Sequence, residues 1–131
     1  HLPLKFAAYE RAILFLERIS PEQLLTRILA ADKPAEYYRL ELVQAIREEF
    51  EHNLAQQLYI EAASWQALVQ AKDEVITLVH HVASSLEKES EGRLLARKIL
   101  ESVQSQESGR IQTASILLKR DIQSWFQVNP S

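Results

Sequence analysis

The chain contains few residues that interrupt helices, with two glycines and four prolines among its 131 residues. Three of the prolines, Pro3, Pro21 and Pro34, stand where apolar helical spacing begins, and proline is well tolerated in the first turn of a helix. A sheet of this length would need many tight turns, which glycine and proline usually form. The scarcity of both residues therefore predicts an all-α fold.

Apolar residues recur at intervals of three and four through most of the chain, which indicates amphipathic helices. The run Ser20-Pro21-Glu22-Gln23 is a helix-start signal, and Gly109 interrupts the pattern before the last helix. We expect an antiparallel bundle of four long helices plus a short extra helix. The long helices are expected over residues 3–18, over residues 34–59, from Glu61 or Ser64 to residue 86, and over residues 91–105. The short helix is expected over residues 21–29, and a last helix over residues 110–126.

Charge and cysteine content exclude several classes of partner and site. The net charge is −3, from 15 Lys and Arg against 18 Asp and Glu, and neither half of the chain is basic. A nucleic-acid-binding domain usually carries a basic patch, so we expect no nucleic-acid partner. The chain has no cysteine, which rules out disulfides and thiolate metal ligands within it.

The chain begins at His1 and contains no methionine, which predicts a fragment of a longer protein. We expect residues 1–131 to form one domain, because this length suits a single hydrophobic core. The longest apolar run, Ala12 to Leu16, is far too short to cross a bilayer. Any membrane anchor is therefore expected in sequence that is missing here.

Several stretches of the chain are similar to one family. They are FAAYERAILFLERI at residues 6–19, SPEQLL at residues 20–25, and IREEFEHNLAQQLYI at residues 46–60, followed by Trp65 and by AKDE at residues 71–74. Together they resemble an uncharacterised family from the Bacteroidota, known as a domain of unknown function. The resemblance covers most of residues 4–126.

The resemblance implies a membrane-anchored protein. In that family a transmembrane helix and a short charged linker usually precede the domain. By implication the full protein is anchored in the inner membrane and the helical domain lies in the cytoplasm. No activity is known for the family, so the resemblance assigns no functional residues.

One pair of residues has the spacing of a metal site. Glu49 and His52 form a Glu-x-x-His pair, which di-iron helical bundles use twice. A second pair is missing, because neither His80 nor His81 follows a glutamate at that spacing. Helical geometry also turns His52 away from the apolar stripe. A solvated or locally paired Glu49 and His52 is therefore the favoured interpretation.

Two cations fall within apolar stripes and are candidates for burial. They are Lys72 and Arg47, the latter between Val43 and Leu54. A buried cation is costly unless it is paired, so we expect a structural ion pair with a glutamate on a neighbouring helix, or a Lys stem that extends to the surface. The alternative is a groove that binds an acidic peptide or a phosphate. The expected stripe around Arg47 consists of Leu40, Val43, Ile46, Phe50, Leu54 and Leu58.

Leu14 falls on the polar face of the first expected helix, on the side that carries Arg11 and Arg18. A helix with apolar residues on nearly all sides is either buried all round or offers a second face to a partner. The candidate partner-binding residues are therefore Leu14, Arg11 and Arg18.

Known catalytic patterns are missing from the sequence, which has neither a nucleophile elbow nor a glycine-rich phosphate loop. We therefore expect no enzyme activity and no cofactor. The favoured function is an interaction or scaffold domain that binds a protein partner, or a second copy, through helix faces. The alternative is a bundle that binds a metal through Glu49 and His52, or a small ligand near Lys72 and Arg47.

Overall fold

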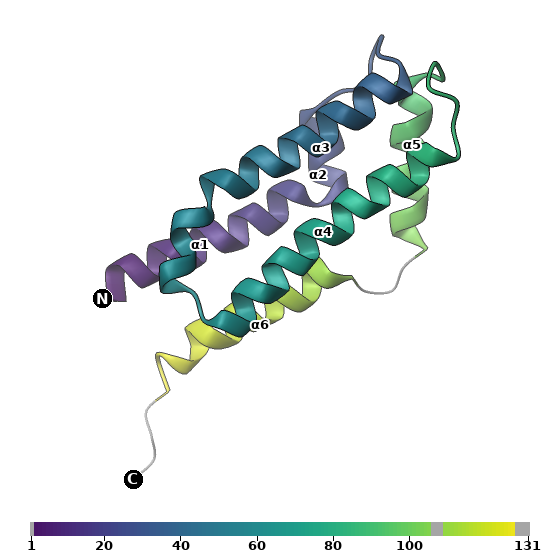
Figure 1. The fold of residues 1–131 in the computed structure, drawn as a ribbon. Coiled ribbons are helices and arrows are strands. Elements are labelled where there is room, and N and C mark those ends of the chain that lie inside the picture. The colour runs from purple at the N-terminus through teal and green to yellow at the C-terminus, as the bar shows by residue number, and fades with distance from the viewer. Residues whose placement is uncertain (1, 106–108, 128–131) are drawn as a thin grey trace.

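The structure is a computed structural model and describes residues 2–105 and 109–127. In these ranges one helix follows another along the chain (Figure 1). Within these ranges, strand pairing is limited to one isolated antiparallel bridge between Pro34 and Glu91. The prediction of an all-α fold is confirmed. The helices are α1 (Leu2–Ile19), α2 (Pro21–Arg27), α3 (Ala35–His52), the 3₁₀ helix η1 (Leu54–Tyr59), α4 (Ala62–Ser84), α5 (Gly92–Gln104) and α6 (Arg110–Ser124).

Four helices run along the length of the molecule in alternating directions: α1, α3, α4 and α6 (Figure 1). Helix α6 packs against α1 and α4 at the end where the chain begins. At the other end, α2 and α5 pack against each other, and α5 also contacts α3 and α4. The fourth long bundle helix is therefore α6, while α5 crosses one end obliquely. None of the described helices is long and apolar enough to cross a membrane.

The core contains both aliphatic and aromatic side chains. Phe50 joins two parts of it, because its ring centroid lies 6.0 Å from that of Phe15 and 5.7 Å from that of Trp65. Such aromatic pairs add to the free energy gained by burial. The largest side chains with almost no exposed surface are Tyr9, Tyr38, Phe15, Leu16, Ile19, Leu24, Leu42, Ile46, Leu68, Leu95, Ile99 and Leu118.

The long helix expected over residues 34–59 ends earlier, at His52. The Asn53 side-chain amide donates a hydrogen bond to the Glu49 carbonyl at 2.7 Å, and η1 then changes the direction of the chain. None of the residues of η1 is buried, and Leu58 is 86% exposed. The apolar spacing continues past the true helix end, which is why Leu54 and Leu58 were wrongly expected in the core.

Two loops at the far end of the bundle are joined by backbone hydrogen bonds. The Ala35 N–H donates to the Ser90 carbonyl at 2.6 Å, and the Gly92 N–H donates to the Lys33 carbonyl at 2.7 Å. The loop before α5 therefore satisfies an N–H in the first turn of α3, which has no side-chain cap. This contact holds α5 against the start of α3.

Tyr38 links α3 to the end of α2. Its hydroxyl donates a hydrogen bond to the Ile28 carbonyl at 2.5 Å, and its side chain is fully buried. Burial raises the pKa of Tyr38 to about 12. Burial also raises the pKa of Tyr9.

We expect the domain to lose stability in alkali, partly through Tyr38. In the unfolded chain tyrosine ionises near pH 10. Between about pH 10 and 12 the unfolded chain therefore loses the Tyr38 proton while the folded chain keeps it, which favours unfolding. The loss through Tyr38 is about 1 kcal/mol at pH 11 and is absent below pH 9. Urea unfolding of Tyr38→Phe at pH 9 and pH 11 checks this, because the variant should show a smaller alkaline loss than the parent. An equal loss in both proteins would contradict it.

Candidate functional site

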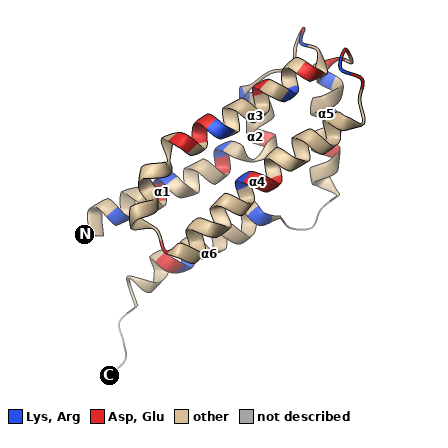
Figure 2. Ribbon diagram, viewed as in Figure 1, with Lys and Arg blue, Asp and Glu red and all other residues tan. Residues whose placement is uncertain are grey.

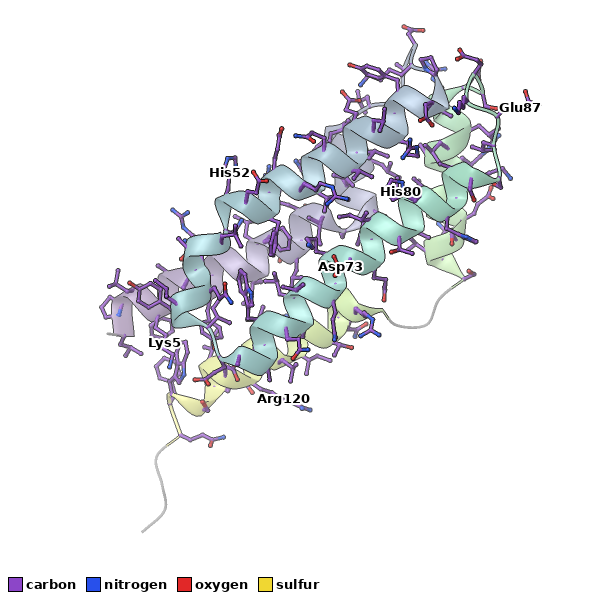
Figure 3. The ribbon with its side chains drawn as sticks, in the orientation of Figure 1. Lys5, His52, Asp73, His80, Glu87 and Arg120 are labelled. Carbon is purple, nitrogen blue, oxygen red and sulfur yellow. The ribbon has the colours of Figure 1, made fainter. Side chains whose placement is uncertain are left out.

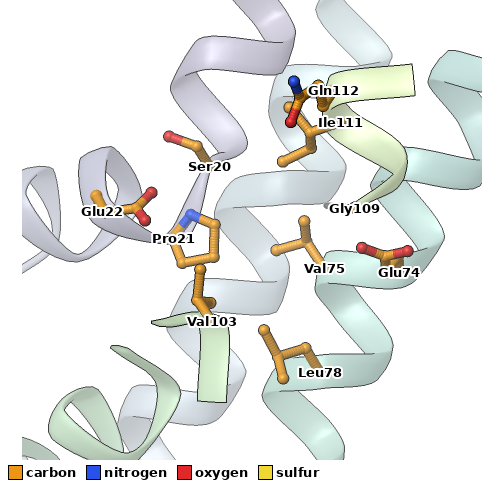
Figure 4. Close-up of a pocket in the computed structure, with 10 residues that line it drawn as sticks. All are labelled: Ser20, Pro21, Glu22, Glu74, Val75, Leu78, Val103, Gly109, Ile111 and Gln112. Atoms are coloured by element: carbon orange, nitrogen blue, oxygen red, sulfur yellow. The ribbon is translucent and has the colours of Figure 1, made fainter. Parts of the chain in front are cut away.

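A cavity of about 290 Å³ opens where α2, α4, α5 and α6 meet (Figure 4). Apolar side chains from all four helices form part of its wall, and two glutamates stand among them. Its volume is close to the lower limit for small-molecule sites. The described lining residues are Ser20, Pro21, Glu22, Glu74, Val75, Leu78, Val103, Gly109, Ile111 and Gln112.

Glu74 of α4 holds the start of α6 at this cavity. One of its carboxylate oxygens, Oε1, accepts a hydrogen bond from the Arg110 backbone N–H at 3.3 Å. The other oxygen lies 3.6 Å from Nε of Arg110, whose guanidinium also donates to Gln70 at 2.9 Å. Helix α6 has no side-chain cap at Gly109, so Glu74 supplies one from a neighbouring helix.

Two of the polar side chains that line the cavity already make structural contacts. The Ser20 hydroxyl already donates a hydrogen bond to the Glu17 carbonyl at 2.7 Å, and Glu74 is engaged by Arg110. Among the described lining residues no histidine or lysine stands beside Ser20 to act as a base. An apolar group could fill the cavity, with Glu22 and Glu74 at its edge.

The two candidate buried cations lie elsewhere and differ from each other. The Lys72 side chain is largely buried, with its ammonium 3.1 Å from Asp73 Oδ1 and 4.3 Å from the centre of the Phe50 ring. Arg47 is exposed, so its expected burial was wrong. The buried stripe of α3 passes through Ile46, one residue away, which turns Arg47 outward by about 100°.

The two residues of the Glu-x-x-His pair have different surroundings: Glu49 forms ion pairs with two arginines, and His52 faces solvent. One Glu49 carboxylate oxygen lies 2.5 Å from an Arg18 nitrogen and 3.7 Å from an Arg27 nitrogen, which ties α3 to α1 and α2. His52 is exposed and projects away from the bundle (Figure 3). Within residues 2–105 and 109–127, no three His, Asp or Glu side chains are grouped closely enough to hold a metal ion.

The three candidate partner-binding residues of α1 have different surroundings. Leu14 and Arg11 are exposed, as a docking surface requires. Arg18 is engaged by Glu49, which also raises the pKa of the Arg18 guanidinium. Arg18 therefore serves the packing of α1 on α3.

A polar network that the sequence did not reveal joins α1, α4 and α6. The Tyr9 and Ser64 hydroxyls both donate to Oδ2 of Asp121, at 2.8 and 2.5 Å. The Tyr9 oxygen in turn accepts a hydrogen bond from the Glu61 N–H at 3.0 Å. Asp121 is the single acidic residue of α6, which is the one sequence signal that could have drawn attention to it.

A second unexpected contact involves one of the adjacent histidines. Arg39 of α3 lies with a guanidinium nitrogen 2.9 Å from Nδ1 of His80 on α4, and the same guanidinium pairs with Glu36. The hydrogen bond from Arg39 holds the pKa of the Glu36 carboxyl below its usual range. A guanidinium only donates, so Nδ1 accepts and the ring proton of His80 lies on Nε2. His80 thereby joins α4 to α3.

These features define an all-α bundle domain with an apolar surface cavity and polar links between its helices. The chain belongs to a family of unknown function, DUF7935, which it matches over residues 1–125. No curated protein and no solved structure matches it.

Proposed function

We propose that this domain is a non-catalytic interaction or scaffold domain of a bacterial protein anchored in the inner membrane. The domain would lie on the cytoplasmic side and bind a protein partner through helix faces. The anchor would lie outside residues 1–131, as the family resemblance implies. The main structural support for the place at the membrane is the distribution of exposed apolar side chains.

Exposed apolar residues gather at the end of the bundle where α1 begins. The start of α1, η1 and the end of α6 all lie there (Figure 1). The Phe126 ring packs against Phe6 with centroids 5.5 Å apart and still leaves most of its side chain exposed. The large apolar residues exposed in these segments are Leu2, Leu4, Leu54, Leu58, Tyr59 and Phe126.

Such a gathering of leucine and aromatic residues is typical of a surface that meets lipid or protein. Lys5 lies at the same end, 4.9 Å from the centre of the Trp125 ring and 3.8 Å from the Glu61 carboxylate. A cation among exposed aromatic and aliphatic side chains suits the surface of an anionic membrane. We therefore propose that this end of the bundle rests on the membrane.

Vesicle binding tests this orientation. The domain is expected to sediment with vesicles of phosphatidylethanolamine and phosphatidylglycerol, because Leu58 and Phe126 gain free energy when they leave water. Leu58→Ser combined with Phe126→Ser should weaken binding about tenfold, which corresponds to about 1.4 kcal/mol. The matched control is Leu14→Ser combined with Leu40→Ser, which removes similar apolar surface from the sides of the bundle.

Two results would contradict the proposed orientation. One is a parent domain that stays in the supernatant at every lipid concentration. The other is an equal loss of binding in the control pair, which would show non-specific hydrophobic adsorption rather than contact through one end.

A further inference from the structure

A shallow groove of about 580 Å³ lies along the outer side of α3, beside the residue that ends α2. It extends from Tyr37 to Glu48, a distance of about 16 Å along the helix. Two of its apolar residues are more than half exposed, Tyr37 at 58% and Leu40 at 53%. The groove is lined by Ile28, Tyr37, Leu40, Glu41, Gln44, Ala45 and Glu48.

The groove arises because α3 presents apolar residues on two sides. Leu42 and Ile46 face the core and are fully buried. Leu40 was expected in the same stripe, but it lies on the opposite side, where the chain leaving α2 at Ile28 forms the facing wall. This apolar surface therefore stays open in the folded chain.

All charged residues that line the groove are acidic. Glu41 forms an ion pair with Lys33, whose ammonium lies 2.7 Å from the Glu41 carboxylate. Glu48 accepts a hydrogen bond from the neutral Gln44 amide at 2.9 Å. Acidic residues also outnumber basic ones along α3 as a whole (Figure 2). The groove thus combines an apolar floor with a negative edge.

Resting on the proposed interaction function, we infer that this groove binds a helix of a partner protein, with aliphatic residues on one face and Lys or Arg beside them. The length of the groove suits about three helical turns. Leucines of the partner would cover Leu40 and Ile28, and its cations would meet Glu48. A second copy of the chain is a poorer occupant, because it carries a net charge of −3 and would bring the same glutamates to the contact.

A designed peptide pair tests the inference without knowledge of the natural partner. The probe is a helical peptide of about 16 residues with leucines at helical spacing and flanking lysines, and its counterpart carries glutamates in place of the lysines. Fluorescence anisotropy measures binding to the whole 131-residue chain at low salt. We expect the lysine peptide to bind at least tenfold more tightly than the glutamate peptide.

Matched variants locate the site. Leu40→Ser and Glu48→Lys are each expected to weaken binding of the lysine peptide about fivefold to tenfold. Ile116→Ser and Glu101→Lys are the controls: Ile116 is 42% exposed on α6, Glu101 is exposed on α5, and neither residue lines the groove. The controls should bind within about twofold of the parent.

The outcomes separate this inference from the membrane proposal. Equal weakening by the control variants, equal binding of both peptides, or no binding would overturn the groove while leaving vesicle binding untouched. Light scattering tests whether a second copy of the chain occupies the groove. If the parent is a dimer and Leu40→Ser dissociates it, the groove belongs to a second copy instead. A monomeric parent with the expected variant pattern supports the partner helix.

Discussion

Gly92→Ala is expected to lower the free energy of unfolding by about 2 kcal/mol. A Cβ atom at this position would lie 2.8 Å from the Lys33 carbonyl oxygen and 3.2 Å from that of Ala30. Both are backbone atoms, so the loop before α3 would have to move and its 2.7 Å hydrogen bond from the Gly92 N–H would stretch. Alanine normally stabilises a helix relative to glycine, so a loss here would identify the close backbone contact as the cause.

Gly109→Ala is the matched control for this prediction. A Cβ atom there would lie 2.9 Å from Oε1 of Glu74, which is the end of a flexible side chain and can turn aside. Gly109→Ala should lower the free energy of unfolding by less than about 1 kcal/mol, because it weakens only the cap that Glu74 supplies to the start of α6. Chemical denaturation of both variants provides the comparison. Equal stability changes at the two glycines would contradict the assignment.

Asp121→Ala is expected to be the most destabilising substitution of a polar residue in α6, with a loss of about 2–3 kcal/mol. The change removes the acceptor of both the Tyr9 and the Ser64 hydroxyl, and both side chains are buried. Thermal and urea unfolding of the variant measure the effect.

A double-substitution cycle separates the network from a general effect of losing a carboxylate. Tyr9→Phe and Asp121→Ala together should cost at least about 0.5 kcal/mol less than the sum of the single changes, because they remove the same hydrogen bond. Asp73→Ala is the control for charge, since Asp73 is exposed and pairs only with Lys72 among the described residues. Additive effects, or an equally large loss at Asp73, would contradict the network.

The sequence contains enough information to predict where most helices begin. Ser20 and Pro21 mark the start of α2, and Gly109 precedes α6, because these residues act through local backbone geometry. The end of α3 was harder to predict, since apolar spacing continues through Leu54 and Leu58 although the helix has stopped. The same continued spacing led to the wrong prediction that Arg47 is buried. Helix ends that depend on tertiary contacts leave little trace in periodicity.

The candidate site residues could be predicted only in part. Lys72 was found because a cation in an apolar stripe is conspicuous in the sequence. Glu74 and Asp121 were not found, since each binds a group on another helix, and the sequence does not say which helix faces lie together. The groove depends on Leu40 pointing outward beside Ile28, which requires the path of the chain between α2 and α3.

Mapping of backbone amide chemical shifts on the isotope-labelled domain, with the lysine peptide added stepwise, tests the central claim most directly. The groove predicts saturable shifts at Ile28 and across residues 37–48, with little change at Ile116 on α6. Shifts concentrated around Gly109 and Ile111, at the cavity beside α6, would contradict the groove and place binding there. Shifts that spread evenly over all acidic residues and do not saturate would contradict any specific interaction surface.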